Sequence, residues 1–221
     1  MKASPEHALK LAKLSVDCGF LITHLIRQAD GLSDSDARKR LLSILDASSD
    51  SPAPVLKASN SGWYSTCSGA YVYDPDKSKM TVAGETPVVC FTEATLNGLQ
   101  GHKEVFNAKY GIAFDRDWIF KKGANPCINI RDDIFKKTIS QKHKNGNLYN
   151  WLPRDLHPFV NIINTSFDAT HEREWRHSGD FNFRLSDVMF VFCPQKDFRF
   201  LSALQTNGRP VLFDLDWLSK Y

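Results

Sequence analysis

The segment "HEREWRH", residues 171–177, decides how the rest of the sequence is read, because a helix and a strand would place its charged groups differently. On a helix Glu172 and Glu174 would point about 200° apart, whereas on a strand they share a face. The flanking segments "DAT" (168–170) and "HSGD" (177–180) both interrupt a helix. We therefore predict a strand that carries Glu172, Glu174 and Arg176 on one face.

The two carboxylates of this strand would lie about 7 Å apart along the chain and would repel each other when both are ionised. Arg176 beside them would lower that cost. Such a pair can act in general acid/base catalysis or can stabilise a developing cation. A second interpretation is a ladder of salt bridges between strands on an exposed sheet face. A zinc site is not indicated, because position 175 is Trp and the spacing H-E-x-x-H is missing.

Other segments have the pattern of short strands. Apolar runs rich in strand-forming residues occur at "FLITHLIR" (20–27) and "VVCF" (88–91). The same pattern recurs at 111–114, 127–130, 157–164, 187–194 and 209–218. The mixture of aromatic and turn residues at 62–80 indicates irregular structure or a hairpin, and the stretch from 48 to 62 is predicted to be a loop.

Helices are expected mainly early and in the middle of the chain. Apolar residues at helical spacing predict a first helix over 5–16, and Ser33 or Ser35 can cap a second whose Leu41, Leu42 and Leu45 face inward. A short helix or turn is predicted at "DRDWIFKKG" (115–123), and a solvated helix at 131–150. We therefore predict an α+β fold and a single domain over 1–221, with an N-terminal helical part (1–19) and an α+β core (20–221).

Composition is that of a soluble globular protein, with 42% hydrophobic and 24% charged residues. A net charge of +3 permits a nucleic-acid partner without requiring one. The five cysteines are odd in number and form no CxxC pair, which argues against a disulfide framework and a zinc knuckle. No run approaches the roughly 18 apolar residues of a membrane span. We expect a cytoplasmic protein with no membrane partner.

Several side chains outside 171–177 are candidates for ligand binding. Thr92 and Glu93 end an apolar strand, and Thr92 could either bind a ligand or cap the turn. His24 and Arg27 lie in an apolar run, where a histidine is usually a core side chain. The motifs G-x-G-x-x-G, G-x-x-x-x-G-K-[ST] and G-x-S-x-G are missing, so dinucleotide-fold NAD enzymes, P-loop NTPases and α/β-hydrolases are not supported.

A set of blocks in fixed order resembles a known family. The blocks are "FLITHLIR", "ARKRLLSIL", "VVCFTEATL", "YGIAFDRDWIFKKGANPCINI", "HEREWRHSGDFNF" and "DVMFVFCP". This order resembles the AbiGi-like abortive-infection proteins of bacterial phage resistance and covers most of residues 20–195. The resemblance implies a role in phage defence and specifies no reaction.

A second resemblance concerns chemistry. The segments "THLIR" (23–27), "CFTE" (90–93) and "EREW" (172–175) resemble three strands of the ADP-ribosyltransferases, especially the DarT-type branch that modifies nucleic acids. The resemblance implies an ADP-ribosyltransferase-like split β-sheet core with peripheral helices, and NAD as the co-substrate. A fixed carboxylate would then stabilise the cation that forms when the bond between nicotinamide and ribose breaks.

This second resemblance also implies a set of site residues. Glu174 would be the catalytic glutamate and Glu172 would orient the nucleophile. His24 would contact the NAD ribose, and Thr92 would support the nicotinamide pocket. Arg27 and Tyr64 would complete the NAD site, with the ring of Trp63, Tyr64 or Tyr71 stacking on nicotinamide.

Three functions therefore stand as hypotheses. The first is an ADP-ribosyltransferase of phage defence or toxin–antitoxin type; the basic run between Lys136 and Lys144 slightly favours DNA or RNA as acceptor, although such runs are usually solvated helix faces. The second is a non-enzymatic module, either the neutralising partner of a toxin or a sensor. The third is a metal-dependent nuclease that uses Asp115, Glu172 and Glu174.

Overall fold

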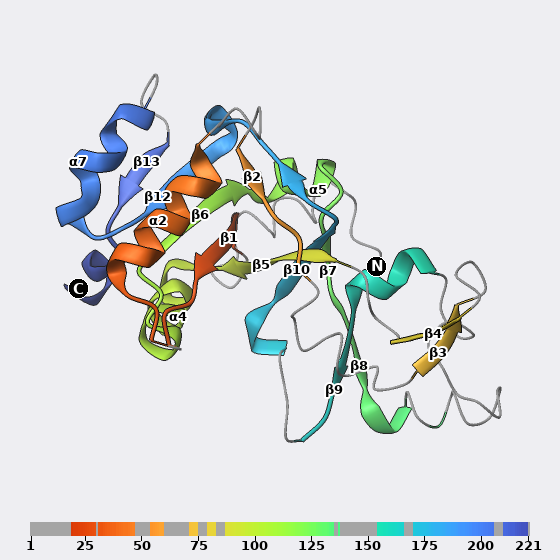
Figure 1. Ribbon diagram of the computed structural model, residues 1–221. Helices are drawn as coiled ribbons and strands as arrows, with labels where there is room; N and C mark the ends of the chain where they lie inside the picture. The colour runs from red at the N-terminus through yellow and green to blue at the C-terminus, as the bar shows by residue number, and fades with distance from the viewer. Residues whose placement is uncertain are drawn as a thin grey trace, which may run out of the picture. The chain divides into compact units, whose positions relative to one another are not determined.

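The computed structural model describes residues 19–29, 31–46, 54–59, 71–74, 79–82, 87–134, 137, 154–165, 170–205 and 210–220. Within these ranges the protein has the mixed α+β architecture that the sequence predicts (Figure 1). Contacts divide the chain into two compact units. Unit 1 comprises Met1–Val55, Phe91–Lys122 and Asn182–Tyr221, and unit 2 comprises Leu56–Cys90 and Gly123–Phe181. The single-domain hypothesis stays a prediction.

Unit 1 contains a mostly antiparallel sheet in the strand order β13-β12-β6-β1-β5 (Figure 1). The strands are β1 (Leu21–Ile26), β5 (Val88–Ala94, which begins in unit 2), β6 (Tyr110–Asp115), β12 (Val188–Phe192) and β13 (Val211–Phe213). Neighbours are antiparallel along this order except for β12 and β13, which are parallel. The predicted strands at 20–27, 88–91, 111–114 and 187–194 are thereby confirmed.

The central strand β6 is buried on both faces of the sheet. Its first five residues, "YGIAF", are all buried, as expected for a strand that packs on both sides. Gly111 is required here, because a Cβ at this position would lie 2.5 Å from the carbonyl oxygen of His24. On one face Ala94, Ala113 and Phe192 pack with Leu99 and Leu215.

Helices surround this sheet. They are α2 (Asp34–Leu45), α4 (Leu96–Phe106), α5 (Arg116–Lys121) and α7 (Phe198–Leu201). The 3₁₀ helices of unit 1 are η4 (Leu185–Asp187), η5 (Gln195–Asp197), η6 (Ser202–Leu204) and η7 (Leu215–Lys220). Ser33 caps α2 by accepting a hydrogen bond from the Asp36 amide. Leu41 and Leu45 are buried as predicted, whereas Leu42 is only half-buried. Thr95 caps α4 in the same way through the Gly98 amide, a helix that the sequence pattern did not predict.

Unit 2 is built from short strands. It contains the hairpin β3 (Tyr71–Asp74) and β4 (Lys79–Val82), the parallel pair β8 (Ile128–Arg131) and β9 (Val160–Ile163), and the antiparallel pair β7 (Asn125–Pro126) and β10 (Glu174–Ser178). The 3₁₀ helices η2 (Arg154–Phe159) and η3 (Thr170–Glu172) precede β9 and β10. The strands β2 (Val55–Leu56) and β11 (Phe181–Asn182) pair with each other, and the division between the units falls within each of them.

Parts of the sequence interpretation fall outside the described residues. These are the first helix (5–16), most of the loop at 48–62 and most of the charged helix at 131–150. The hairpin option for 62–80 is confirmed by β3 and β4. The ADP-ribosyltransferase-like arrangement of the sheet stays a prediction.

Candidate functional site

The strand that carries Glu174 is shorter than predicted. Thr170–Glu172 forms the 3₁₀ helix η3, Arg173 has a φ of +43°, and only Glu174–Ser178 is strand. A left-handed residue between Glu172 and Glu174 breaks the two-residue alternation on which a shared face depends. The prediction that Glu172, Glu174 and Arg176 line one strand face is therefore wrong for Glu172. Glu174 and Arg176 both lie on β10, two residues apart.

Glu174 and Arg176 form a buried ion pair with two hydrogen bonds. Arg176 Nε donates to Glu174 Oε1 over 2.8 Å, and Arg176 Nη2 donates to Glu174 Oε2 over 2.9 Å. Arg176 is 0% exposed and Glu174 is 8% exposed. The alternative prediction, a ladder of salt bridges between strands on an exposed sheet face, does not describe this pair, because both residues lie on β10 and both are buried.

The remaining donors of Arg176 bind within unit 2. Nη1 donates to the carbonyl oxygens of Pro158 (3.0 Å) and Val160 (3.2 Å), and Nη2 also donates to Asn161 Oδ1. A guanidinium has five N–H groups, and these bonds with the two to Glu174 supply an acceptor for each. Burial acts against the charged form of Arg176, but its neighbours, Glu174 among them, outweigh burial and raise the pKa of Arg176. Arg176 therefore fixes β10 to the segment that leads into β9.

Asn161 on β9 completes this cluster. Its Nδ2 donates to Glu174 Oε2 over 3.1 Å and to Asn129 Oδ1 over 3.3 Å. Asn161 is buried, and both the NH2 group and the oxygen of its side chain form hydrogen bonds. Glu174 Oε2 thus accepts two hydrogen bonds and Oε1 accepts one, so neither carboxylate oxygen is left without a donor.

Two thiols of unit 2 belong to the same environment. Burial, followed by the charge of Glu174, raises the pKa of Cys90 to about 12. Burial also raises the pKa of Cys127, whose backbone amide donates to the Glu174 carbonyl over 2.8 Å. Both thiols stay protonated at neutral pH, so they are poor nucleophiles.

This cluster holds strands together and closes around its own carboxylate. Both oxygens of this buried carboxylate already accept hydrogen bonds, from Arg176 and Asn161. The arrangement ties β10 to β9 and joins the backbone before β9 to the same guanidinium. The geometry of this cluster therefore supports a structural role most directly.

The predicted NAD-binding residues on β1 and β5 lie in unit 1. The side chain of Thr92 is half-buried, and its backbone oxygen accepts a hydrogen bond from Thr23 Oγ1 over 3.1 Å. Thr23 is the register partner of Thr92, so these two residues share a sheet face and the adjacent His24 lies on the other. There His24 packs edge-on against Phe91, with ring centroids 6.0 Å apart. The guanidinium carbon of Arg27 lies 4.2 Å from the centroid of the Phe106 ring.

The other predicted site residues are placed as follows. Glu172 and Glu174 belong to unit 2, whereas His24, Arg27 and Thr92 belong to unit 1. Tyr64 and Trp63 lie outside the described residues, as do most residues of the basic run between Lys136 and Lys144. The NAD roles assigned to these residues remain predictions.

Asp115, which the nuclease hypothesis names, caps a helix. Its Oδ1 accepts a hydrogen bond from the Trp118 amide at the start of α5. Asp115 lies in unit 1 and the two glutamates of that hypothesis lie in unit 2. Among the residues that can be described, no group of three or more His, Cys, Asp and Glu side chains is placed so that it could hold a metal ion.

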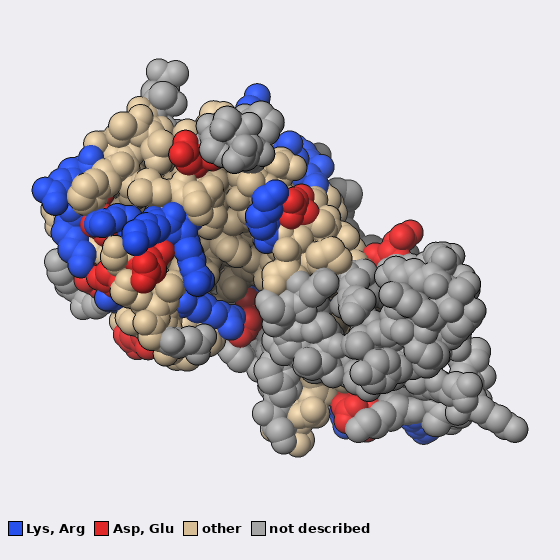
Figure 2. Space-filling model, viewed as in Figure 1, with Lys and Arg blue, Asp and Glu red and all other residues tan. Residues whose placement is uncertain are grey.

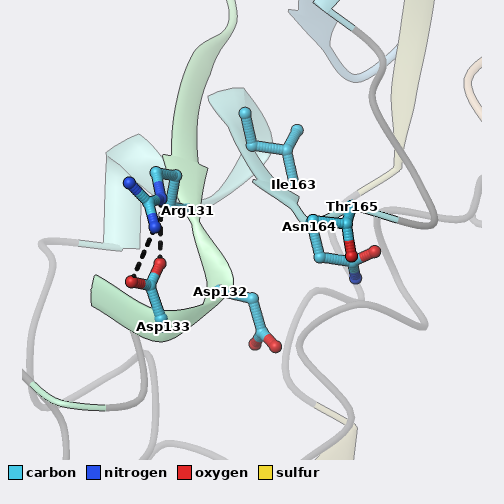
Figure 3. Close-up of a pocket in the computed structure, with 6 residues that line it drawn as sticks. All are labelled: Arg131, Asp132, Asp133, Ile163, Asn164 and Thr165. Atoms are coloured by element: carbon cyan, nitrogen blue, oxygen red, sulfur yellow. Dashed lines mark hydrogen bonds and ion pairs between the residues drawn. The ribbon is translucent and has the colours of Figure 1, made fainter.

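A cavity of about 560 Å³ lies in unit 2 where β8 and β9 end. It is lined by Arg131, Asp132, Asp133, Ile163, Asn164 and Thr165 (Figure 3). Arg131 and Asp133 form a bidentate pair with bonds of 3.0 and 2.9 Å, and Asp132 extends toward the side where Asn164 and Thr165 lie. These residues could not be grouped from the sequence, because they follow two strands that are far apart in the chain.

The role of Asn161 in the buried cluster was also not predicted from the sequence. The segment "HPFVNIIN" showed only the apolar pattern of a strand, in which one polar residue gives no sign of its partner. A buried asparagine inside a strand requires hydrogen-bond partners, and this requirement is the signal that could have marked it.

The comparisons with known proteins agree with the first resemblance. The family description "Putative abortive phage resistance protein AbiGi, antitoxin" matches residues 64–193, which is more than half of the 221 residues. Searches of curated proteins and of solved structures found no match. In the described part of the chain, every helix is too short or too polar to span a membrane. From the extent of the family match, the chain belongs to the AbiGi family of abortive phage resistance proteins.

Proposed function

We propose that this protein is the antitoxin of an abortive-infection system, and that it acts by binding and neutralising a protein toxin. The family match over residues 64–193 supports this role, because the family description names an antitoxin. The proposal corresponds to the second of the three hypotheses drawn from the sequence. Phage defence is the part of the function that it shares with the first.

The Glu174 cluster is the structural observation that carries the proposal. An ADP-ribosyltransferase needs a carboxylate that faces its substrate, whereas Glu174 is 8% exposed and accepts hydrogen bonds from Arg176 and Asn161. A role of Glu174 in strand packing therefore fits these contacts without a catalytic function. A binding protein needs such a rigid framework and does not need a reactive acid.

Growth of a bacterial host tests the proposal. The toxin of the same abortive-infection system is placed under one inducible promoter and this chain under another. We expect growth arrest with the toxin alone, normal growth with the chain alone, and recovery when both are expressed. Growth arrest by the chain alone, or no recovery with both proteins present in soluble form, would contradict the antitoxin role.

The ADP-ribosyltransferase hypothesis has a separate test. If Glu174 were catalytic, the wild-type protein would release nicotinamide from NAD, and Glu174→Gln would abolish release in a protein that remains folded. Chromatographic measurement of nicotinamide checks this outcome. Under the antitoxin proposal, nicotinamide appears no faster with the wild type than with the variant.

A further inference from the structure

An exposed phenylalanine in unit 1 is surrounded by positive charge. Phe200 on α7 is 45% exposed, and the guanidinium carbons of Arg38 and Arg199 lie 4.6 and 4.7 Å from its ring centroid. Lys196 lies on the neighbouring 3₁₀ helix η5. We call these residues the Phe200 patch: Arg38, Lys196, Arg199 and Phe200. Figure 2 shows Lys and Arg side chains gathered over α2 and α7 on this side of the molecule.

The Phe200 patch is held in place from the core. Arg38 Nη1 donates to Asp197 Oδ1 over 2.8 Å, and the buried Tyr110 hydroxyl donates to Asp197 Oδ2 over 2.5 Å. Asp197 is itself buried. Lys196 forms a second link, because its Nζ lies 2.9 Å from Asp34 on α2. A fixed arginine loses less conformational entropy on binding than a mobile one, so the patch is pre-organised.

Aromatic and arginine side chains are the residues most often found at the energetic centres of protein interfaces. A solvated Phe ring with two guanidiniums has the composition of such a centre. A complementary surface would offer carboxylates to the arginines and an apolar recess to the ring.

We propose that the Phe200 patch binds an acidic surface of the toxin, with Phe200 as the apolar anchor and Arg199 as the charged one. This inference rests on the antitoxin function proposed above and names the surface that performs it. The patch lies outside the matched residues 64–193. It is therefore a place where this chain can select its own toxin without any change to the part that defines the family.

A protein partner fits the Phe200 patch better than a nucleic acid. Arg38 and Lys196 are already paired with Asp197 and Asp34, so the patch offers little unpaired positive charge to a run of phosphates. The chain's net charge of +3 is also small for a protein that binds nucleic acid mainly through phosphates.

Isothermal titration calorimetry with the purified toxin tests the inference. The variants are Phe200→Ala and Arg199→Glu; Arg38 is left intact because its bond to Asp197 also supports the fold. We expect each variant to weaken toxin binding by about 30-fold, the size of an interface hot spot. The affinity of the wild type should also fall as salt is raised.

Matched controls come from α5 in the same unit. Phe120 is 58% exposed and Lys121 is exposed, so Phe120→Ala and Lys121→Glu repeat the two chemical changes away from the patch. We expect both controls to bind the toxin within about twofold of the wild type. Circular dichroism of every variant reports whether it is folded.

The outcomes separate the two proposals. If the wild type binds the toxin and folded Phe200→Ala and Arg199→Glu bind it equally well, the patch is not the interface although the antitoxin role stands. If the wild type does not bind the toxin, the antitoxin role fails and this inference fails with it. Displacement of the toxin from the wild type by duplex DNA, lost in Arg199→Glu, would assign the patch to nucleic acid and would overturn the inference.

Discussion

Two acid–arginine pairs with the same spacing lie in unit 2 in different surroundings. Glu174 and Arg176 have side chains that are 6% and 0% exposed, whereas Arg131 and Asp133 are 69% and 63% exposed. Both pairs are bidentate, with bonds between 2.8 and 3.0 Å. Water screens the exposed pair and does not reach the buried one, so the two should differ greatly in their contribution to stability.

Removing the charge of Glu174 should therefore be costly. Glu174→Gln leaves Arg176 buried without a counter-charge, and we expect it to lower the free energy of unfolding by about 3–5 kcal/mol. Asp133→Asn, the matched change in the exposed pair, should lower it by about 1 kcal/mol or less. Urea unfolding followed by circular dichroism measures both values. Equal losses in the two variants would mean that Glu174 is not the buried partner described here.

Thiol reactivity offers an independent probe of the same cluster. Because burial raises the pKa of Cys90 to about 12 and also raises that of Cys127, very little thiolate exists at pH 8. Native protein treated with iodoacetamide should show almost no modification at these two positions by peptide mass spectrometry, and protein unfolded in urea should be modified fully. Fast labelling of both thiols in the native state would show that the cluster is open to solvent.

At the scale of elements, capping residues explain where α2 and α4 begin. Ser33 accepts from the Asp36 amide at the start of α2, and Thr95 accepts from the Gly98 amide at the start of α4. The start of α2 could be predicted because a cap precedes leucines at helical spacing. Helix α4 was missed because Gly98 and Gly101 interrupt its apolar pattern, although its capping residue is plain in the sequence.

The capping role of Thr95 predicts a measurable loss of stability. Thr95→Ala removes the acceptor for the Gly98 amide and should lower the free energy of unfolding by about 1 kcal/mol, whereas Thr95→Ser keeps the hydroxyl and should cost less. Thermal or urea unfolding of the two variants gives the comparison. If Thr95→Ser proved as costly as Thr95→Ala, the hydroxyl would not be the stabilising group.

The strand β10 shows where prediction from sequence ends. Strand structure at Glu174–Ser178 follows from the segment itself, because the neighbouring residues interrupt a helix. The left-handed conformation of Arg173 does not follow, since few non-glycine residues adopt it. The burial of the ion pair depends on Asn161 and on the backbone before β9, whose positions are set by tertiary packing.

At the scale of the whole molecule, charged groups link segments that are distant in the chain. Asp34 on α2 is bonded by Lys109, which directly precedes β6, and by Lys196 on η5. These bonds hold the pKa of the Asp34 carboxyl well below its usual value of 3.8. The sequence contains these three charged residues, but it could not show that they would meet, because they lie up to 162 positions apart.

This lowered pKa predicts a pH dependence of stability. Below about pH 4 the unfolded chain binds a proton at Asp34 while the folded protein does not, so stability falls as the pH falls toward the lowered pKa. Asp34→Asn removes this contribution, and its stability should fall less steeply between about pH 4 and pH 2, by up to ~1.4 kcal/mol per pH unit. Urea unfolding across this range checks it; identical slopes would contradict the prediction.

We propose that the chain neutralises a toxin by binding and that Glu174 serves the fold. The double variant Glu174→Gln/Arg176→Met removes both charges together, which a buried site tolerates far better than the loss of one. The decisive measurement is growth of a toxin-expressing host that carries this variant, with circular dichroism confirming that the variant is folded. We expect recovery equal to that with the wild type; failure of a folded double variant to restore growth would overturn this proposal.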